Sequence, residues 1–224
     1  MKRIIAALAV MYLAVSSGLA QDPAKVSPEH YKVEIDNQYV RVIRATRGPR
    51  EKAPMHVHPE NVLIFLTPVH QRITAANGMV MELKKNAGDV VFSGPVKHEE
   101  ESLSDQPMEV IIIELKPGHP PIQPVPAEFD PVKAATQFHP VEFENEHVRI
   151  LRASRDSSVT VPMHQHGPYV TVPLTDVHVN ATSPDGTVRE STRIAGVVGF
   201  REGAKHSIQN VGAGRMEEIQ VELK

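Results

Sequence analysis

Six histidines recur at matching positions in two parts of the sequence, and they are the residues best suited to chemistry. The two sets are His56, His58 and His98, and His164, His166 and His206. Residues i and i+2 of a strand point to the same face, so each His-x-His pair places two imidazoles side by side. Two imidazoles from one strand and a third from a neighbouring strand can hold a divalent metal and leave open positions for water or a substrate.

One His-x-His pair by itself is weak evidence, because exposed strands often carry histidines. Recurrence of the whole triplet favours metal binding in at least one of the two sets. Three imidazoles do not distinguish Fe, Mn, Ni or Zn. No catalytic acid or base and no substrate-binding residue is identifiable from the sequence.

The two histidine sets belong to an internal duplication. Residues 39–45 (YVRVIRA) align with residues 147–153 (HVRILRA), and 54–58 (PMHVH) align with 162–166 (PMHQH). The same shift along the sequence also aligns ELK at 114–116 with ELK at 222–224, and no gap is needed. The spacing is too long for a solenoid repeat, so each copy should be a whole domain. We expect domains at 21–116 and 131–224, joined by a proline-rich linker at 117–130.

Each copy has the periodicity of strands. Residues 33–35 and 40–42 alternate between apolar and polar or charged types, and residues 110–113 form a short β-branched run. After residue 20, no long window has the 3.6-residue period of an amphipathic helix. The pattern predicts two all-β domains, as sandwiches or barrels.

The motifs around the histidines resemble those of the cupin superfamily, and their duplication resembles a bicupin. The first motif is at 54–59 (PMHVHP) and 162–167 (PMHQHG). The second is at 88–98 (GDVVFSGPVKH) and 196–206 (GVVGFREGAKH), with Asn210 where the family pattern has its Asn. This resemblance implies two tandem jelly-roll β-barrels, each with three histidines that hold a divalent metal at the barrel mouth.

The sequence departs from the cupin pattern at one metal ligand. The family usually has a Glu four or five residues after His-x-His, but those positions here are Val62, Leu63, Val170 and Thr171. A three-histidine site is therefore expected, with Glu60 as a less favoured extra ligand in the first copy. Three neutral ligands do not offset the positive charge of the metal ion, and this favours an anionic co-ligand or substrate. The second copy follows the family pattern more closely and is expected to be the intact site.

Other charged and histidine residues have structural interpretations. We expect four repeated arginines to pair with carboxylates on neighbouring strands: Arg41, Arg44, Arg149 and Arg152. The repeated His70 and His178 are expected on an outer or rim position rather than beside the metal. The run 99–101 (EEE) has no counterpart in the second copy and is interpreted as a solvated loop.

Residues 1–20 have the pattern of a signal peptide. Lys2 and Arg3 precede an apolar run at 4–15, and small residues lead to an expected cleavage after Ala20. The run is shorter than the roughly 20 residues that cross a bilayer, although an N-terminal membrane anchor is the alternative. The protein is therefore expected to be periplasmic or secreted, with no membrane association after cleavage.

Composition restricts the partners. The formal net charge of −3 gives no electrostatic reason to bind nucleic acid, and the absence of Cys excludes thiolate sites. We expect a small-molecule ligand or substrate, and pairing of barrel edges within the bicupin or in a homodimer. Three functions stay open: a metal-dependent oxygenase or isomerase, a non-enzymatic metal or ligand binder, and a structural bicupin with vestigial sites.

Overall fold

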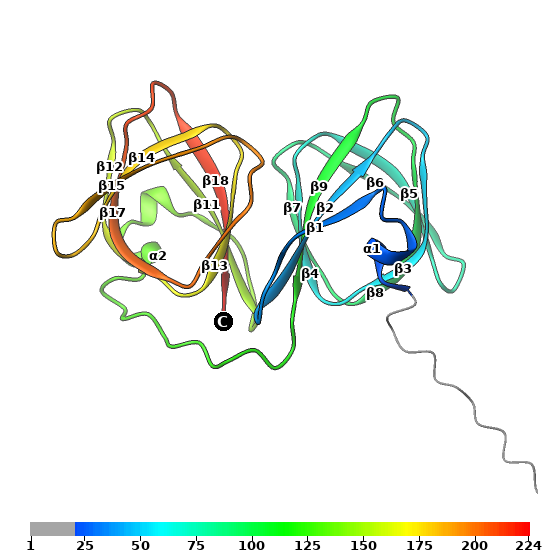
Figure 1. Ribbon diagram of the computed structural model, residues 1–224, viewed down its shortest axis with the longest axis horizontal. Coiled ribbons are helices and arrows are strands. Elements are labelled where there is room, and N and C mark those ends of the chain that lie inside the picture. Colours follow the sequence, from blue (N-terminus) through cyan, green and yellow to red (C-terminus); the bar gives the residue numbers. More distant parts are fainter. Residues whose placement is uncertain (1–20) are drawn as a thin grey trace, which may run out of the picture.

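The computed structural model describes residues 21–224, and the expected signal peptide lies outside this range. Two β-barrels stand side by side, one from each copy of the duplication (Figure 1). Each barrel is made of a five-stranded and a four-stranded antiparallel sheet. The predicted fold class, two tandem cupin-type jelly-roll β-barrels, is confirmed.

The N-terminal barrel contains nine strands. Its five-stranded sheet has the order β1-β2-β9-β4-β7, and its four-stranded sheet has the order β3-β8-β5-β6. The strands are β1 (Tyr31–Asp36), β2 (Val40–Arg47), β3 (Lys52–His58), β4 (Asn61–Phe65), β5 (Val69–Ala75), β6 (Val80–Lys85), β7 (Val90–Ser93), β8 (Val96–Ser102) and β9 (Met108–Leu115).

The C-terminal barrel repeats this topology strand for strand. Its sheets have the orders β10-β11-β18-β13-β16 and β12-β17-β14-β15. The strands are β10 (Val141–Glu144), β11 (Val148–Arg155), β12 (Thr160–His166), β13 (Tyr169–Pro173), β14 (Val177–Thr182), β15 (Val188–Arg193), β16 (Gly199–Arg201), β17 (Ala204–Asn210) and β18 (Met216–Leu223).

A short helical segment precedes each barrel. Helix α1 (Pro23–Val26) begins at Asp22, whose carboxylate accepts a hydrogen bond from the Ala24 amide, and α2 (Pro131–Ala134) begins in the same way at Asp130. A 3-10 helix, η2 (Thr136–Phe138), follows α2. Residues 117–130 run without helix or strand from β9 to α2. No helix of residues 21–224 is long and apolar enough to cross a membrane.

The central strands of the two five-stranded sheets are buried on both faces, whereas the edge strands β1 and β10 are largely exposed. On β2, Val40 and Val42 belong to a core cluster that both barrels share, whereas Ile43 and Ala45 point into their own barrel. Successive residues of a strand face opposite sides of the sheet. A strand with consecutive apolar residues, such as residues 110–113 of β9, therefore places apolar side chains on both faces. The shared cluster consists of Val40, Val42, Val62, Ile64, Ile111, Ile113, Val148, Ile150, Val170, Val172, Ile219, Val221 and Leu223.

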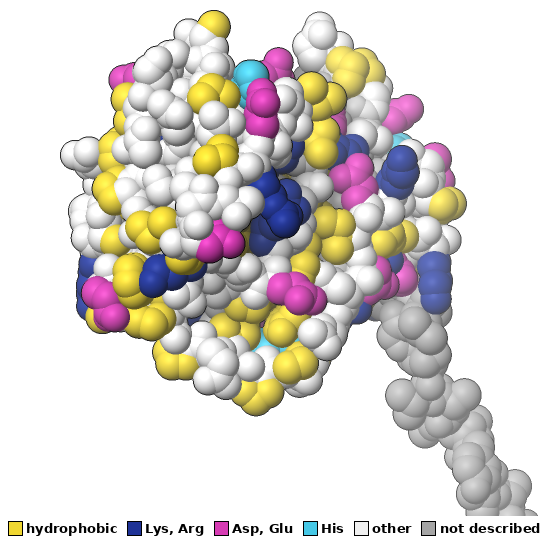
Figure 2. Space-filling view, turned by 60° about the vertical axis from the view of Figure 1, so that its left-hand side comes forward, with side chains coloured by type: hydrophobic (Ala, Val, Ile, Leu, Met, Phe, Trp, Pro, Cys, Tyr) yellow, Lys and Arg dark blue, Asp and Glu magenta, His cyan; other side chains and the backbone are white. Residues whose placement is uncertain are grey.

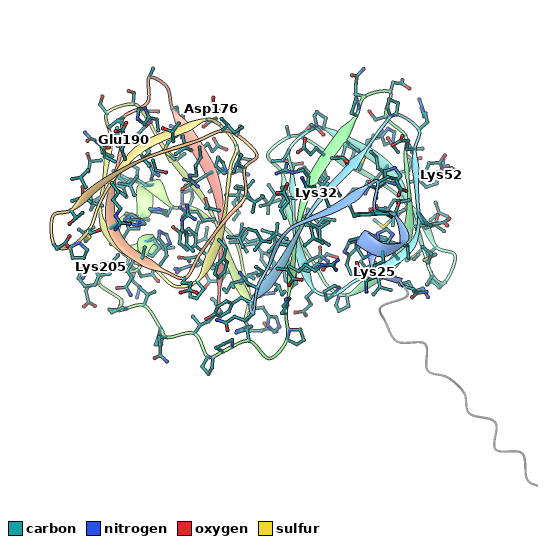
Figure 3. All side chains as sticks on the ribbon, in the orientation of Figure 1. Lys25, Lys32, Lys52, Asp176, Glu190 and Lys205 are labelled. Carbon is teal, nitrogen blue, oxygen red and sulfur yellow. The ribbon has the colours of Figure 1, made fainter. Side chains whose placement is uncertain are left out.

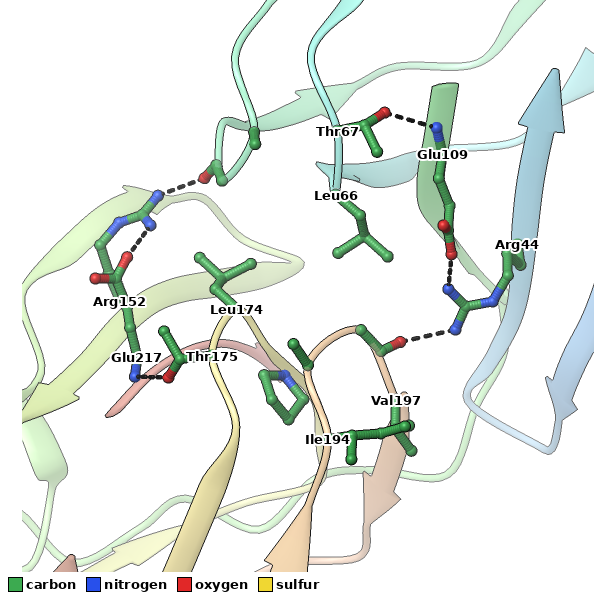
Figure 4. A pocket seen from close by; sticks show the side chains of 15 residues that line it. Arg44, Leu66, Thr67, Glu109, Arg152, Leu174, Thr175, Ile194, Val197 and Glu217 are labelled. Carbon is green, nitrogen blue, oxygen red and sulfur yellow. Dashed lines mark hydrogen bonds and ion pairs between the residues drawn. The ribbon is translucent and has the colours of Figure 1, made fainter. Parts of the chain in front are cut away.

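A pocket of about 650 Å³ lies at one edge of this interface (Figure 4). Arg44 Nη2 donates to the Gly196 carbonyl at 2.7 Å, and Arg152 Nη2 donates to the Gly88 carbonyl at 2.7 Å. The two contacts are related by the duplication, so each barrel holds the other in the same way. Both guanidinium groups are also paired with carboxylates, which confirms the expected role of these arginines.

The outer surface is polar and mixed. On the face in Figure 2, acidic and basic side chains are interspersed with single hydrophobic ones. His70 Nε2 lies 3.1 Å from Glu82 on the N-terminal barrel, and His178 pairs with Glu190 in the equivalent place. Glu190 is labelled on the outside of the C-terminal barrel in Figure 3. The expected outer position of both histidines is confirmed.

Candidate metal centres

The first three histidines converge inside the N-terminal barrel. His56 and His58 lie on the inward face of β3, and His98 on β8 is the register partner of His56. The three side chains are buried, and one ring nitrogen from each lies within 4.8 Å of the others. Strand pairing thus joins residues that are far apart in the sequence.

Hydrogen bonds fix the orientation of two of these rings. His56 Nδ1 lies 2.7 Å from the Pro54 carbonyl, and His58 Nδ1 lies 2.8 Å from Glu114 Oε1. These oxygens only accept in their ordinary ionisation states, so each Nδ1 carries the proton and a neutral ring keeps its lone pair on Nε2. Burial lowers the pKa of His56 to about 4 and also lowers the pKa of His98. Neutral imidazoles oriented by outer partners are the form that binds metals, so this donor set fits a divalent ion.

A buried carboxylate lies beside the first triad. Glu100, on β8, has an 11% exposed side chain, and its Oε1 lies 3.6 Å from His98 Nε2. It pairs with Arg47 and accepts a hydrogen bond of 2.8 Å from the Tyr31 hydroxyl. Burial would raise the pKa of Glu100, but the Arg47 guanidinium and nearby histidines lower it to about 2. The carboxylate is therefore ionised at neutral pH.

The position of Glu100 corrects the sequence interpretation of residues 99–101. They were expected to form a solvated loop, but they lie within β8, where the Glu100 side chain points inward. Because alternate residues of a strand face opposite sides, one glutamate of such a run can be buried while its neighbours stay exposed. The first triad therefore has a carboxylate beside it, two residues after the third histidine, although Glu100 is not part of the convergent group.

Four histidine rings gather in the C-terminal barrel. His164 and His166 lie on β12, and His206 on β17 is the register partner of His164. The ring of His206 is 4.8 Å from that of His164 and 5.7 Å from that of His166, centroid to centroid. The ring nitrogens that lie within 4.8 Å of one another are those of His139, His164 and His166, so His139 and not the predicted His206 completes the convergent group.

The surroundings of these rings also fit a metal. His164 Nδ1 lies 2.7 Å from the Pro162 carbonyl, and His166 Nδ1 lies 2.7 Å from Glu222, which repeats the arrangement of the first barrel. Nε2 of both His139 and His166 is buried without a hydrogen-bond partner. Burial lowers the pKa of His139 to about 2, of His164 to about 4 and of His206 to about 3. Buried, unpartnered lone pairs that face one another are what a cation would satisfy.

His139 was not predicted, because only histidines present in both copies were considered. Its counterpart under the duplication is Tyr31, whose hydroxyl lies 3.1 Å from His56 Nε2. Both residues follow the short helical segment before the barrel and enter its interior. Tyr31 and His139 occupy equivalent positions in the two copies. The alignment would have shown this if positions with different residue types had also been considered.

Glu60 does not lie at the first triad. Its carboxylate is 3.5 Å from His147 Nε2, a residue of the other copy. At the positions of the missing family glutamate, Val62 and Val170 belong to the core between the barrels. Leu63 faces the interior of its own barrel, and the Thr171 hydroxyl donates to Glu218. None of these four residues belongs to either convergent histidine group.

The interiors of the two barrels differ beyond the histidines. The N-terminal barrel contains a cavity of about 240 Å³, bordered by His58, His98 and Glu100 at one end. In the C-terminal barrel, Glu218 lies among Arg193 at 2.8 Å, the Thr171 hydroxyl at 2.9 Å and the Gln220 amide at 2.9 Å. This network occupies positions whose N-terminal counterparts are mostly cavity-lining apolar residues.

Comparison with known proteins supports the fold and leaves the activity open. No protein-family model and no curated protein sequence matches the chain. Among solved structures it is similar to AerE from Microcystis aeruginosa, with 13% identity, a TM-score of 0.60, and coverage of 87% of this chain and 97% of that one. It is also similar to a salicylate 1,2-dioxygenase from Pseudaminobacter salicylatoxidans, with 13% identity, a TM-score of 0.60, and coverage of 88% and 77%.

A third similar structure is an oxalate decarboxylase from Lactobacillus farciminis in a formate complex. It has 14% identity, a TM-score of 0.57, and coverage of 86% of this chain and 83% of that one. These neighbours are cupin-domain proteins, and with the two histidine clusters they identify the fold of the chain as that of a bicupin. Both the dioxygenase and the decarboxylase folds extend over nearly the whole of residues 21–224.

Proposed function

We propose that this protein is a bicupin that binds a divalent metal in each barrel and transforms a small molecule at the N-terminal centre. One observation carries the proposal. In both barrels the Nδ1 atoms of the His-x-His pair are held by outer acceptors, so that Nε2 lone pairs meet inside the barrel. Fe, Mn, Ni and Zn all accept such a donor set.

The N-terminal centre has the features of a reactive site. A metal held by three imidazoles would supply a Lewis-acidic centre with open positions for substrate. Glu100 and Tyr31 lie at the edge of the triad, where the carboxylate can accept a hydrogen bond from a bound molecule and the tyrosine hydroxyl can hold a proton. Arg47 keeps the carboxylate charged, and the cavity gives the substrate a space next to the histidines. The similarity to a dioxygenase and a decarboxylase supports this class of chemistry.

The C-terminal centre favours a second function, non-enzymatic metal binding. Its convergent nitrogens belong to His139, His164 and His166, and the Nε2 atoms of His139 and His166 are buried without a partner, which suits a bound ion. The Glu218 network stands where the N-terminal barrel has the cavity-lining residues Leu63, Val110 and Ile112. A purely structural bicupin with vestigial sites is less well supported, because buried unpartnered Nε2 atoms are costly unless they bind something.

Elemental analysis of tag-free protein, loaded with each metal in turn, tests the proposal. We expect about two metals per chain, and about one after either His56→Ala/His58→Ala or His164→Ala/His166→Ala. The outer pair His70→Ala/His178→Ala is the matched control and should retain both. A content below about 0.2 per chain under all loading conditions, or no effect of either inner double change, would contradict metal binding.

Activity separates the two functions. Oxygen consumption or product formation with a panel of small acids and phenols should depend on the N-terminal triad and on Glu100, and not on the C-terminal triad. Glu100→Gln should keep the metal and lose most of the activity, whereas Glu101→Gln, on the same strand, should change little. Full metal content in both barrels with no turnover of any compound would favour the binding function.

We also propose that the protein is exported, on the basis of the sequence of residues 1–20. Fractionation of cells that express the full chain should find a protein that begins at Gln21 in the periplasm or medium. A protein that retains Met1 in the cytoplasm would contradict this proposal.

A further inference from the structure

We propose that the N-terminal cavity receives a small, uncharged, mostly apolar molecule that donates a hydrogen bond to Gln71 Oε1. The inference rests on the proposed function, because it concerns the same centre, and it names the class of substrate. It follows from the cavity wall, from one unpartnered polar atom, and from the charges already present.

The wall of the cavity is apolar on most sides. Side chains from both sheets of the barrel line it: Leu63, Phe65, Ile73, Leu83, Val91 and Ile112. Such a wall offers no partner to a charged or strongly polar group, so the body of a ligand must be apolar. A cavity of about 150 Å³ is known to accept benzene, so about 240 Å³ accommodates one ring with a short substituent.

Gln71 supplies a polar contact that the protein itself does not satisfy. Its side chain is on β5, only 5% of the residue is exposed, and it borders the cavity. Gln71 Nε2 donates to Glu100 Oε1 at 3.2 Å, and since an ionised carboxylate only accepts, the amide orientation is fixed. Gln71 Oε1 is then buried without a partner. A hydroxyl or N–H group of a ligand in the cavity satisfies it.

The charges around the cavity favour a neutral ligand over an acid. Arg47 is the one Lys or Arg among the lining residues; its Nη2 donates to Glu100 and Tyr31, so its charge is balanced by Glu100, and its Nε is buried without a partner. A bound metal would attract an acid to the histidines, but a carboxylate placed at Gln71 Oε1 would face that oxygen and the Glu100 carboxylate, and the one cationic side chain there is already paired with Glu100. A neutral hydroxyl avoids this repulsion and supplies the missing donor.

The C-terminal barrel lacks these features at the equivalent positions. The counterparts of Gln71, Leu63 and Ile112 are Val179, Thr171 and Gln220. The Thr171 hydroxyl and Gln220 Nε2 donate hydrogen bonds to Glu218, although Gln220 Oε1 is itself buried without a partner. What the C-terminal barrel does not repeat is the apolar lining of Leu63 and Ile112 beside the glutamine.

Titration calorimetry of the zinc-loaded full chain with three probes tests the inference. Phenol has the ring and the donor, toluene lacks the donor, and benzoate carries a charge. We expect phenol to bind at least about tenfold more tightly than either of the others. Gln71→Leu should reduce the preference for phenol over toluene to about one, and Val179→Leu, the matched change in the other barrel, should leave it intact.

A second variant tests the inference independently, in case Gln71→Leu does not fold. Val91→Phe fills the cavity from β7 and should abolish phenol binding, with metal content and thermal unfolding close to those of the unchanged protein. Equal binding of phenol and toluene, tighter binding of benzoate, or no binding of any probe would overturn the inference while the zinc content still supports the proposed metal sites. Absence of zinc from the protein would contradict the proposed function instead.

Discussion

The two barrels have the same strands in the same order, and the same outer contacts hold their His-x-His pairs. The residues inside the two barrels nevertheless differ. In the N-terminal barrel, Tyr31 and Glu100 accompany three histidines next to an apolar cavity. In the C-terminal barrel, His139 replaces the tyrosine, and a buried network around Glu218 occupies the interior. The comparison teaches that after a duplication the backbone and the paired histidines can persist while the residues that line the interior diverge.

The largest expected effect comes from the buried network of the C-terminal barrel. Glu218→Val, which introduces the residue that the N-terminal barrel has at Val110, leaves Arg193 and Arg155 without their carboxylate. We expect a loss of about 3–5 kcal/mol in the free energy of unfolding, because an uncompensated charge stays buried. Urea unfolding measures it. Glu217→Ala, the neighbouring and more exposed position, should cost about 1 kcal/mol or less, and an equal cost for both would refute the role of the network.

A smaller effect is expected where the barrels are equivalent. Ile111 and Ile219 occupy the same place in the two copies, and both lie in the core between the barrels. Either change to Ala should cost about 2–5 kcal/mol, and the two losses should be similar, with a single unfolding transition. Ile194→Ala, at a 64% exposed position, is the control. Two separate transitions would show that the barrels do not share this core.

His139 sharpens the comparison of the metal sites. His139→Ala should weaken metal binding in the C-terminal barrel by about 10-fold to 100-fold, since one of the three convergent imidazoles is lost. The matched change Tyr31→Phe should alter metal affinity in the N-terminal barrel by less, because a tyrosine hydroxyl that already contacts Glu100 is not needed as a ligand. Competition with a chelator measures both, and equal effects would remove the distinction between the sites.

The smallest expected effect is the change in the free energy of unfolding of the metal-free protein with each unit of pH. The pKa of His56 and of His164 is lowered by burial to about 4, below the usual value of about 6.5 in an unfolded chain. The unfolded chain therefore binds more protons below pH 6.5, and stability is full above that pH and falls as the pH approaches 4. Each such histidine contributes about 1.4 kcal/mol per pH unit.

The two barrels should differ in this pH dependence as well. His139→Tyr, which copies the N-terminal barrel, removes one histidine whose pKa is lowered and should reduce the slope of stability against pH. Urea midpoints at several pH values between 7 and 4.5 measure the slope. A slope that is unchanged by this substitution would show that His139 is not held neutral by burial.

Much of this arrangement was predictable from sequence. The duplication, the all-β pattern and the two histidine sets all depend on local spacing, and His-x-His on a strand necessarily gives two rings on one face. Glu100 was misassigned because three successive glutamates suggest solvent exposure, whereas strand β8 turns the middle one inward. His139 was missed because it lies outside the recurring motifs and reaches the site through the helical segment before the barrel.

The sequence alone determined that the chain would form two copies of a β-fold, each with a convergent set of imidazoles, because strand periodicity and internal repetition are written in neighbouring residues. Only the tertiary structure decided which side chains meet inside each barrel. The cavity beside Gln71, the carboxylate beside the first triad and the network that fills the second barrel all arise from contacts between distant strands. Such contacts depend on register and on the volumes of facing side chains, and no local pattern specifies those.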